Sequence, residues 1–263
     1  MSIILNKSQI KSIVEIALEA GEIAMKYFRD KNLKIDHKSD NSPVTIADCL
    51  ISELIDKHLK KMLPQIPVIC EEGENRDFRN GIFWLIDPID GTSSFAAGNP
   101  EFTINIALIK NKKPIFGLIS APAIDNYPFY HTDENQNLIR YCIKNKSSEK
   151  FTPPQNNDDL IAIASKRSPN EDILNWLESN SYPAPKKIIK VSSSLKFIYL
   201  VEGKANFYLH LRRSMEWDTA AGQALIIAFG GRVMNLDKSE FLYQKTDLEN
   251  PSFFINQFNN IKH

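Results

Sequence analysis

Two carboxylates, Asp87 and Asp90, stand three residues apart directly after the apolar run 83–86. A short apolar run of this kind predicts a buried strand. Pro88 has no amide hydrogen and disfavours the helical region for its predecessor, so we expect the strand to end at Asp87 in a sharp turn. Residues 91–94, Gly-Thr-Ser-Ser, add hydroxyl and amide groups. Such a stretch can hold a hard cation and a phosphate, although an ordinary Asp/Pro/Gly-rich loop has the same composition.

Two further acids occupy the ends of predicted elements. Glu71 follows a short strand predicted at 67–70, and ligands of layered sheets often sit at strand ends. The alternative for Glu71 is a solvated acidic loop. Asp218 lies in the first turn of an Ala-rich helix predicted over 217–229, where the helix dipole alone also favours an acid.

Two helix starts have both a structural and a functional interpretation. Thr45 and Asp48 have the spacing of a capping box at the start of a helix, which explains Asp48 without any chemistry. The segment 192–196, Ser-Ser-Ser-Leu-Lys, opens a second helix after a predicted strand. Its serines can simply cap that helix, or its amides and Lys196 can bind an anion.

The elements that would position these residues divide the chain into two parts. The first contains amphipathic helices at 8–27 and 50–63 and an antiparallel meander with strands at 101–109, 114–120, 128–131 and 138–142. The second alternates strands at 161–165, 188–191 and 205–210 with helices at 171–178, 195–202 and 217–229, which predicts a mixed sheet. The polar segment 144–159 lies between them. We therefore expect one α/β domain over 1–263, with lobes 1–144 and 155–263.

Composition excludes several classes of protein. Lys+Arg and Asp+Glu number 32 each in the 263 residues, and this balance argues against a partner that is a nucleic-acid polymer. We see neither a signal peptide nor an apolar run of transmembrane length. Cys49, Cys70 and Cys142 are scattered, as in reduced cytoplasmic proteins, and the five histidines lack metal-ligand spacing.

Three features in a fixed order carry a family resemblance. They are the acid after the 67–70 strand, Asp-Pro-Ile-Asp-Gly-Thr at 87–92, and Trp-Asp-Thr-Ala-Ala-Gly at 217–222. The chain resembles the inositol monophosphatase superfamily of magnesium-dependent, lithium-sensitive phosphatases over essentially its whole length. The resemblance implies a layered α-β-α-β-α sandwich of the inositol monophosphatase / fructose-1,6-bisphosphatase type.

The resemblance also implies a ligand set for two or three Mg²⁺ ions in each active site. Glu71, Asp87 and the backbone carbonyl of Ile89 would hold one ion. Asp87, Asp90 and Asp218 would hold a second, with Asp87 bridging the two. All-oxygen ligands of this kind suit Mg²⁺.

The catalytic and substrate-binding roles follow the same resemblance. Amides of Gly91, Thr92 and Ser93 would bind the phosphate. Thr92, helped by Asp48 and Glu71, would orient and deprotonate the attacking water, because a metal acidifies water at such sites.

Three stretches resemble the bacterial 3′(2′),5′-bisphosphate nucleotidases more specifically, at 40–48, 101–109 and 193–197. This resemblance implies hydrolysis of adenosine 3′,5′-bisphosphate to AMP and phosphate, within sulfur metabolism and in the cytoplasm. Its substrate-binding residues would include Ser193, Ser194, Lys196 and Asp218. One departure is visible: Ser93-Ser94-Phe95 stands where these nucleotidases often carry Lys-Glu-Phe.

Other interpretations stay open on the sequence. An inositol-1-monophosphatase and a histidinol-phosphate phosphatase would use the same site. A non-catalytic member could bind an anion or a protein partner, such as RNA polymerase, without turnover, although all the acids are present. A homodimer and contact with the inner membrane face are compatible with the sequence as well.

Overall fold

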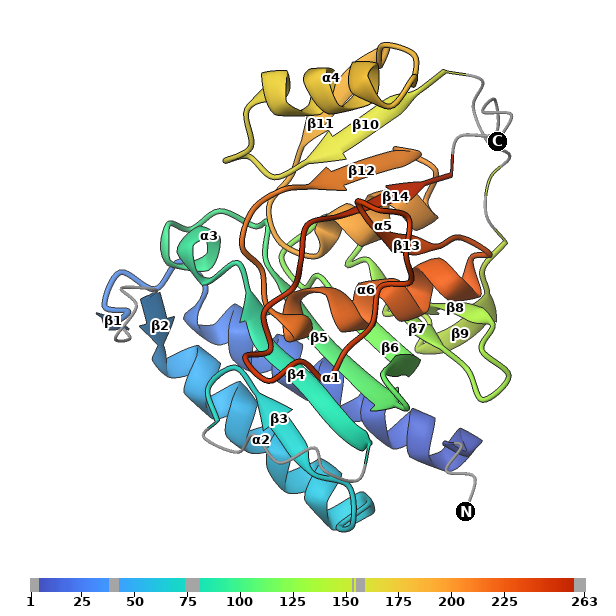
Figure 1. The fold of residues 1–263 in the computed structure, drawn as a ribbon. Helices are drawn as coiled ribbons and strands as arrows, with labels where there is room; N and C mark the ends of the chain where they lie inside the picture. The colour runs from blue at the N-terminus through green and yellow to red at the C-terminus, as the bar shows by residue number, and fades with distance from the viewer. Residues whose placement is uncertain (1–4, 38–42, 74–80, 153, 155–158, 258–263) are drawn as a thin grey trace.

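Five layers of helices and sheets lie one on another in the structure, a computed structural model that describes residues 5–37, 43–73, 81–152, 154 and 159–257. Figure 1 shows α1 and α2, a seven-stranded sheet, α5 and α6, a five-stranded sheet, and α4 in succession. The expected α-β-α-β-α sandwich is confirmed. The helices are α1 Lys7–Tyr27, α2 Ile46–Met62, α3 Thr92–Ala96, α4 Asn170–Ser179, α5 Leu195–Val201 and α6 Glu216–Ala228. None of them, within the described ranges, is both long and apolar enough to cross a membrane.

The larger sheet contains the predicted meander. Its order is β3-β4-β5-β6-β7-β8-β9, with β3 parallel to β4 and every other pair antiparallel. The strands are β3 Val68–Cys70, β4 Ile82–Asp90, β5 Thr103–Lys110, β6 Lys113–Ser120, β7 Phe129–Thr132, β8 Leu138–Cys142 and β9 Ser147–Lys150. A separate antiparallel pair, β1 Ile35–His37 and β2 Pro43–Thr45, precedes α2.

The smaller sheet is mixed, as predicted. Its order is β11-β10-β12-β14-β13, in which β10 is parallel to both of its neighbours and β14 is antiparallel to both of its own. The strands are β10 Ile161–Ala164, β11 Lys187–Lys190, β12 Phe207–His210, β13 Val233–Asn235 and β14 Phe253–Asn256. The three parallel strands therefore present their C-terminal ends at one edge of the sheet.

Alternate side chains along a strand belong to separate hydrophobic cores. In β5, Ile104, Ile106 and Leu108 pack with α1 and α2, whereas Ala107 and Ile109 pack with α5 and α6. A third, smaller core lies between α4 and the outer face of the five-stranded sheet. The period of two that the sequence shows in this strand thus places it between two helical layers.

The structure differs from the sequence-based expectation at several elements. The strand expected to end at Asp87 continues as β4 to Asp90, because Pro88 lies in an irregularity of the ladder where no amide bond is required. The meander continues through β9, beyond its expected end near 144. A short helix, α3, replaces the polar turn after Gly91, and β13 and β14 were not predicted. The predicted turn at 38–42 and Pro153 lie outside the described residues, and the division into two lobes stays a prediction.

Candidate active site

A β-bulge in β4 brings Asp87 and Asp90 to the same face of the sheet. Residues three apart in a regular strand point to opposite faces, because side chains alternate. Here Asp87 pairs with Asn105 and Asp90 pairs with Thr103, so β4 contains one more residue than β5 between these two pairs. The additional residue restores the alternation and aims both carboxylates toward α6.

Asp218 reaches the same place from the start of α6. Its carboxylate accepts a hydrogen bond of 2.7 Å from the backbone amide of Met215, as an acid at a helix N-terminus can. The helix approaches β6 so closely that a Cβ on Gly117 would lie 2.5 Å from both the Ala221 carbonyl oxygen and the Ala224 Cβ. Glycine at position 117 therefore lets α6 lie directly on the sheet and fixes the height of Asp218.

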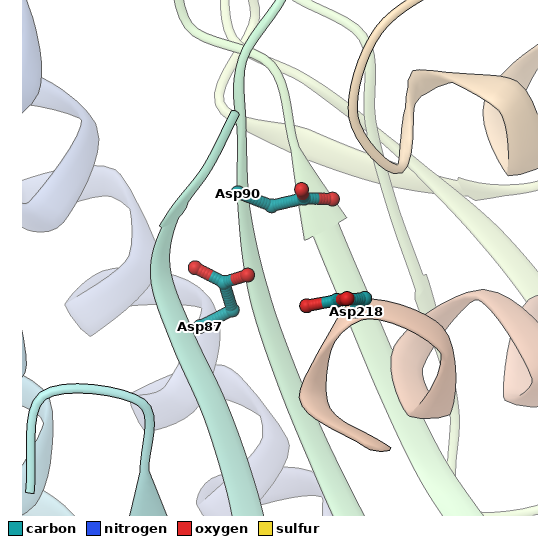
Figure 2. Close-up of side chains that lie close together, drawn as sticks. All are labelled: Asp87, Asp90 and Asp218. Atoms are coloured by element: carbon teal, nitrogen blue, oxygen red, sulfur yellow. The ribbon is translucent and has the colours of Figure 1, made fainter. Parts of the chain in front are cut away.

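The three carboxylates face one another across a small space (Figure 2). One oxygen from each of Asp87, Asp90 and Asp218 lies within 4.8 Å of the other two. Burial raises the pKa of Asp87 well above its usual value, and the charges of Glu71, Asp90 and Asp218 raise it further. Burial likewise raises the pKa of Asp218, with Asp90 as the largest charge effect. Like charges at this separation are unfavourable without a cation.

The acidic triad fits a metal ion. Asp87 is 1% exposed, and its Oδ1 has no hydrogen-bond partner among the described residues. A buried carboxylate oxygen without a donor is unfavourable, and a cation would satisfy it. Three carboxylates offer the oxygen ligands that a hard cation prefers. Glu71 lines the same cleft, and the Ile89 carbonyl oxygen lies 3.0 Å from the Thr92 hydroxyl oxygen.

Ser194, the residue just before α5, holds Asp90 in place. Its backbone amide and its hydroxyl both donate to Asp90 Oδ2 at 2.6 Å. The same hydroxyl lies 2.7 Å from the Asp218 carbonyl oxygen and accepts a 2.9 Å bond from the Asn105 side chain. Ser194, predicted as a substrate-binding residue, is thus buried and engaged with two predicted metal ligands.

Asp48 makes the contact that the capping interpretation predicts and also contacts Thr92. Its Oδ2 accepts from the amide and the hydroxyl of Thr45 at 2.8 and 2.6 Å, which confirms the predicted capping interaction. Its Oδ1 accepts from the Thr92 hydroxyl at 3.3 Å. Burial raises the pKa of Asp48, partly opposed by the Thr45 hydrogen bonds. A carboxylate with a raised pKa is a better proton acceptor near neutral pH.

The predicted phosphate-binding turn begins α3. Gly91 has φ +92°, and a Cβ there would lie 3.1 Å from the Glu101 carbonyl oxygen and 3.3 Å from the Ser193 Cβ. Only glycine adopts this backbone without strain in so little space. The amides of Thr92 and Ser93 follow in the first turn, where helical amides have no intrahelical acceptor.

Lys196 does not point to solvent. Its ammonium donates to the Ser193 carbonyl at 2.5 Å and lies 5.8 Å from the centre of the Tyr208 ring. Burial lowers its pKa, while Asp90, Asp218 and Glu101 oppose that effect. Ser193 has φ 56°, an uncommon conformation for a residue with a Cβ. Lys196 therefore fixes the backbone of Ser193 beside Gly91.

Gly91, Thr92, Ser93 and Lys196 line one cleft of about 510 Å³, a volume typical of small-ligand sites. Glu71, Asp90 and Asp218 are the acids that line it. The cations Lys166, Arg167, Lys196 and Arg213 and the rings of Phe197, Tyr208, His210 and Phe253 also line it. The cleft opens where the ends of β10, β11 and β12 meet the end of β4, as expected for strand ends in layered sheets.

Comparison with known proteins identifies the family. The model of the inositol monophosphatase family matches residues 6–260. The chain is 38% identical over 234 residues to the 3′(2′),5′-bisphosphate nucleotidase CysQ of Buchnera aphidicola subsp. Acyrthosiphon pisum, covering 86% of this chain and 84% of that protein. It is 31% identical over 254 residues to the protein of the same name in Salmonella typhimurium, covering 94% and 98%.

A solved structure agrees with these relatives. The crystal structure of CysQ from Bacteroides thetaiotaomicron, a bacterial member of the inositol monophosphatase family, superposes with a TM-score of 0.79 at 31% identity, covering 97% of this chain and 98% of that one. The chain therefore belongs to the inositol monophosphatase family, and it is a phosphatase.

Several residues of the site were not singled out from the sequence. Asn105 and Thr103 occupy polar positions in a strand that is otherwise apolar, and buried polar side chains need partners. This pattern of polar residues could have identified both positions from the sequence. In the structure the Asn105 amide nitrogen and the Thr103 hydroxyl oxygen lie 3.4 and 3.5 Å from Asp90 Oδ2. Lys166, Arg167 and Arg213 gave no local signal, because their common position depends on the order of strands in the sheet.

We expect Asp87→Asn to abolish turnover while stabilising the metal-free protein. The substitution removes a predicted ligand of both metals, so kcat should fall by about a hundredfold or more. It also removes a carboxylate whose raised pKa makes the folded state less stable as pH rises above the usual range for Asp. The melting temperature measured in a chelator should exceed that of the wild type, by more at pH 8 than at pH 5. A kcat within about threefold of wild type would contradict the two-metal assignment.

Asp48→Asn should lower kcat strongly with little effect on thermal stability. Asparagine still accepts from the Thr45 amide but is a poor proton acceptor for Thr92. The matched control is Thr45→Ala, which removes the hydroxyl contact of the cap; we expect it to cost about 1 kcal/mol of stability and to change kcat little. A variant at Asp48 that melts early and turns over normally would show that capping is its only role.

Proposed function

We propose that the protein is a magnesium-dependent phosphomonoesterase that converts adenosine 3′,5′-bisphosphate to AMP and phosphate. One observation carries the proposal: a single cleft is lined both by Asp90 and Asp218, two members of an acidic triad able to hold a metal ion, and by a wall of cations and aromatic rings. A phosphate ester of a plain polyol needs the first but not the second. The names of relatives at 31–38% identity support the same substrate.

Different residues of the chain would bind the metal and the phosphate. Asp87, Asp90 and Asp218, with Glu71 and the Ile89 carbonyl, would hold Mg²⁺, which supplies Lewis-acid stabilisation of negative charge when bound. The amides at the start of α3 would hold the phosphate that is transferred to water.

Thr92 and Asp48 would handle the proton of the attacking water. When the Thr92 hydroxyl donates to Asp48 Oδ1, its lone pairs are available to accept a proton from water. The raised pKa of Asp48 suits it to receive the proton that Thr92 gives up. The bond from the Thr45 backbone amide keeps the carboxylate oriented during this transfer.

The site of action belongs to the proposal as well. Cys49, Cys70 and Cys142 are not joined to one another by disulfides, as in proteins of a reducing compartment. This supports a cytoplasmic enzyme, consistent with a small, diffusible nucleotide substrate.

Phosphate release should be fastest with adenosine 3′,5′-bisphosphate in a panel that also contains inositol 1-phosphate and histidinol phosphate. The assay uses the purified chain with Mg²⁺ and compares kcat/KM for the three compounds. The Asp87→Asn variant serves as the control for a contaminating phosphatase. A higher kcat/KM for either other compound would reject the proposed substrate, although the assignment as a phosphatase would stand.

Li⁺ should inhibit the enzyme much more strongly than K⁺ at equal ionic strength. Li⁺ is close to Mg²⁺ in size but has half its charge, so at an all-oxygen site it would replace the metal without supplying the same stabilisation. The measurement is the rate of phosphate release at fixed Mg²⁺ and increasing salt. Equal inhibition by the two cations would indicate general screening instead.

A further inference from the structure

Glu216 is an acid in the first turn of α6 to which the chemistry above gives no role. It is buried, with 0% exposure, and is not one of the described residues that line the cleft. Residues two apart on a helix lie about 200° apart around its axis, so Glu216 faces away from the carboxylate of Asp218. We infer that Glu216 is a positioning residue, which anchors the first turn of α6 and thereby keeps Asp218 in place for the metal. This inference rests on the proposed function and adds a determinant of metal affinity to it.

Three donors from one segment of the chain converge on the Glu216 carboxylate. The segment, residues 241–250, is called the strap here; it lies between β13 and β14 and runs beside α6 (Figure 1). The backbone amides of Gln244 and Lys245 donate to the two carboxylate oxygens at 3.0 and 2.9 Å. The Lys245 ammonium lies 2.8 Å from Glu216 Oε1. A buried carboxylate needs hydrogen bonds and an opposite charge, and the strap supplies both.

The strap also binds the backbone that leads into α6. The Glu216 amide donates to the Leu248 carbonyl oxygen at 2.8 Å, and the Asn250 amide donates to the Ser214 carbonyl oxygen at 2.8 Å. The Asn250 side chain donates to the Met215 carbonyl oxygen at 2.6 Å. The start of α6 is therefore held by the strap through its backbone as well as through the Glu216 side chain.

The strap is in turn attached to the seven-stranded sheet. The Tyr243 amide donates to the carbonyl oxygen of Lys112, in the turn between β5 and β6, at 3.0 Å. The rings of Phe241 and Tyr243 are buried in the hydrophobic core between the two sheets. Because β5 is the neighbour of β4, the strap fixes α6 relative to the strand that supplies Asp87 and Asp90.

The position of Asp218 makes such an anchor necessary. The first amides of a helix lack acceptors within the helix, so the first turn is held least by the helix itself. The negative charge of Asp90 acts on Asp218 in this turn, and Asp218 acts in the same way on Asp87. Because Mg²⁺ requires oxygen ligands near ideal octahedral positions, a small shift of the turn would weaken metal binding while every ligand is still present.

The test measures Mg²⁺ binding to the full chain by isothermal titration calorimetry, without substrate. Glu216→Gln keeps the size of the side chain and one acceptor oxygen, whereas Glu216→Ala removes the anchor completely. We expect the Kd for Mg²⁺ to rise about tenfold or more in Glu216→Gln, as for groups that orient a metal ligand, and to rise further in Glu216→Ala. At saturating Mg²⁺ the kcat of Glu216→Gln should stay within about twofold of wild type, because Asp218 itself is unchanged.

Glu202→Gln is the matched control. Glu202 is an acid at the C-terminal end of α5 that accepts from the Tyr130 hydroxyl at 2.9 Å and pairs with Lys204. Its substitution should lower the melting temperature and leave the Kd for Mg²⁺ unchanged. Lys245→Met removes only the ammonium from the anchor and should raise the Kd by a smaller factor than Glu216→Gln.

The alternative is that Glu216 contributes to stability alone, as an acid favoured at a helix N-terminus. A Kd within about twofold of wild type in Glu216→Gln, or an equal rise in Glu202→Gln, would overturn the positioning role and leave the proposed function intact. If neither Glu216 variant folds, Lys245→Met decides, and an unchanged Kd in that variant overturns the positioning role. Failure of the wild type to bind Mg²⁺ would overturn the metal dependence in the proposed function and the inference with it.

Discussion

The mutual repulsion of three carboxylates is the constraint around which this molecule is built. Asp87, Asp90 and Asp218 lie close together, and burial and neighbouring charge both raise the pKa of Asp87 and of Asp218. The folded chain must hold them together before any cation compensates their charge. Three features hold them in place. The bulge in β4 directs Asp87 and Asp90 to one face, α6 packs closely on Gly117, and Ser194 donates two hydrogen bonds to Asp90.

The same constraint explains why two sheets are needed. The seven-stranded sheet supplies Asp87 and Asp90, but the donors that orient Asp90 come partly from Ser194, in the segment between β11 of the five-stranded sheet and α5. Asp218 comes from the helical layer between the sheets. An acid presented from one element could turn away from its neighbours, whereas acids tied across layers cannot. Preorganised charge of this kind is what electrostatic catalysis requires.

Much of this arrangement could be predicted from local patterns. Period-two alternation identified the β5 region, helical periodicity identified α1 and α2, and the spacing of Thr45 and Asp48 predicted the start of α2. The motif at 87–92, which contains proline and glycine, predicted Asp87 and Asp90 as site residues. Each of these patterns spans only a few neighbouring residues, so it can be recognised in a single sequence.

What could not be predicted depends on register and strand order. The bulge at Pro88 is invisible in the sequence, since proline is equally compatible with the end of a strand. The buried position of Lys196 depends on Tyr208, twelve residues away on another element. The cations of the β10 and β12 loops come together only because those strands are adjacent, although helices and β11 separate them along the chain.

The bond between Asp90 and Ser194 spans 104 residues of sequence, and this separation affects how the protein is made. During synthesis all strands of the larger sheet emerge before either Ser194 or α6 exists. Domains tend to fold from the N-terminal side as the chain grows. The sheet can therefore begin to assemble while Asp87 and Asp90 still face water, and their repulsion becomes unfavourable only when α6 docks. The most strained part of the molecule is thus completed late, when most of the hydrophobic core is already in place.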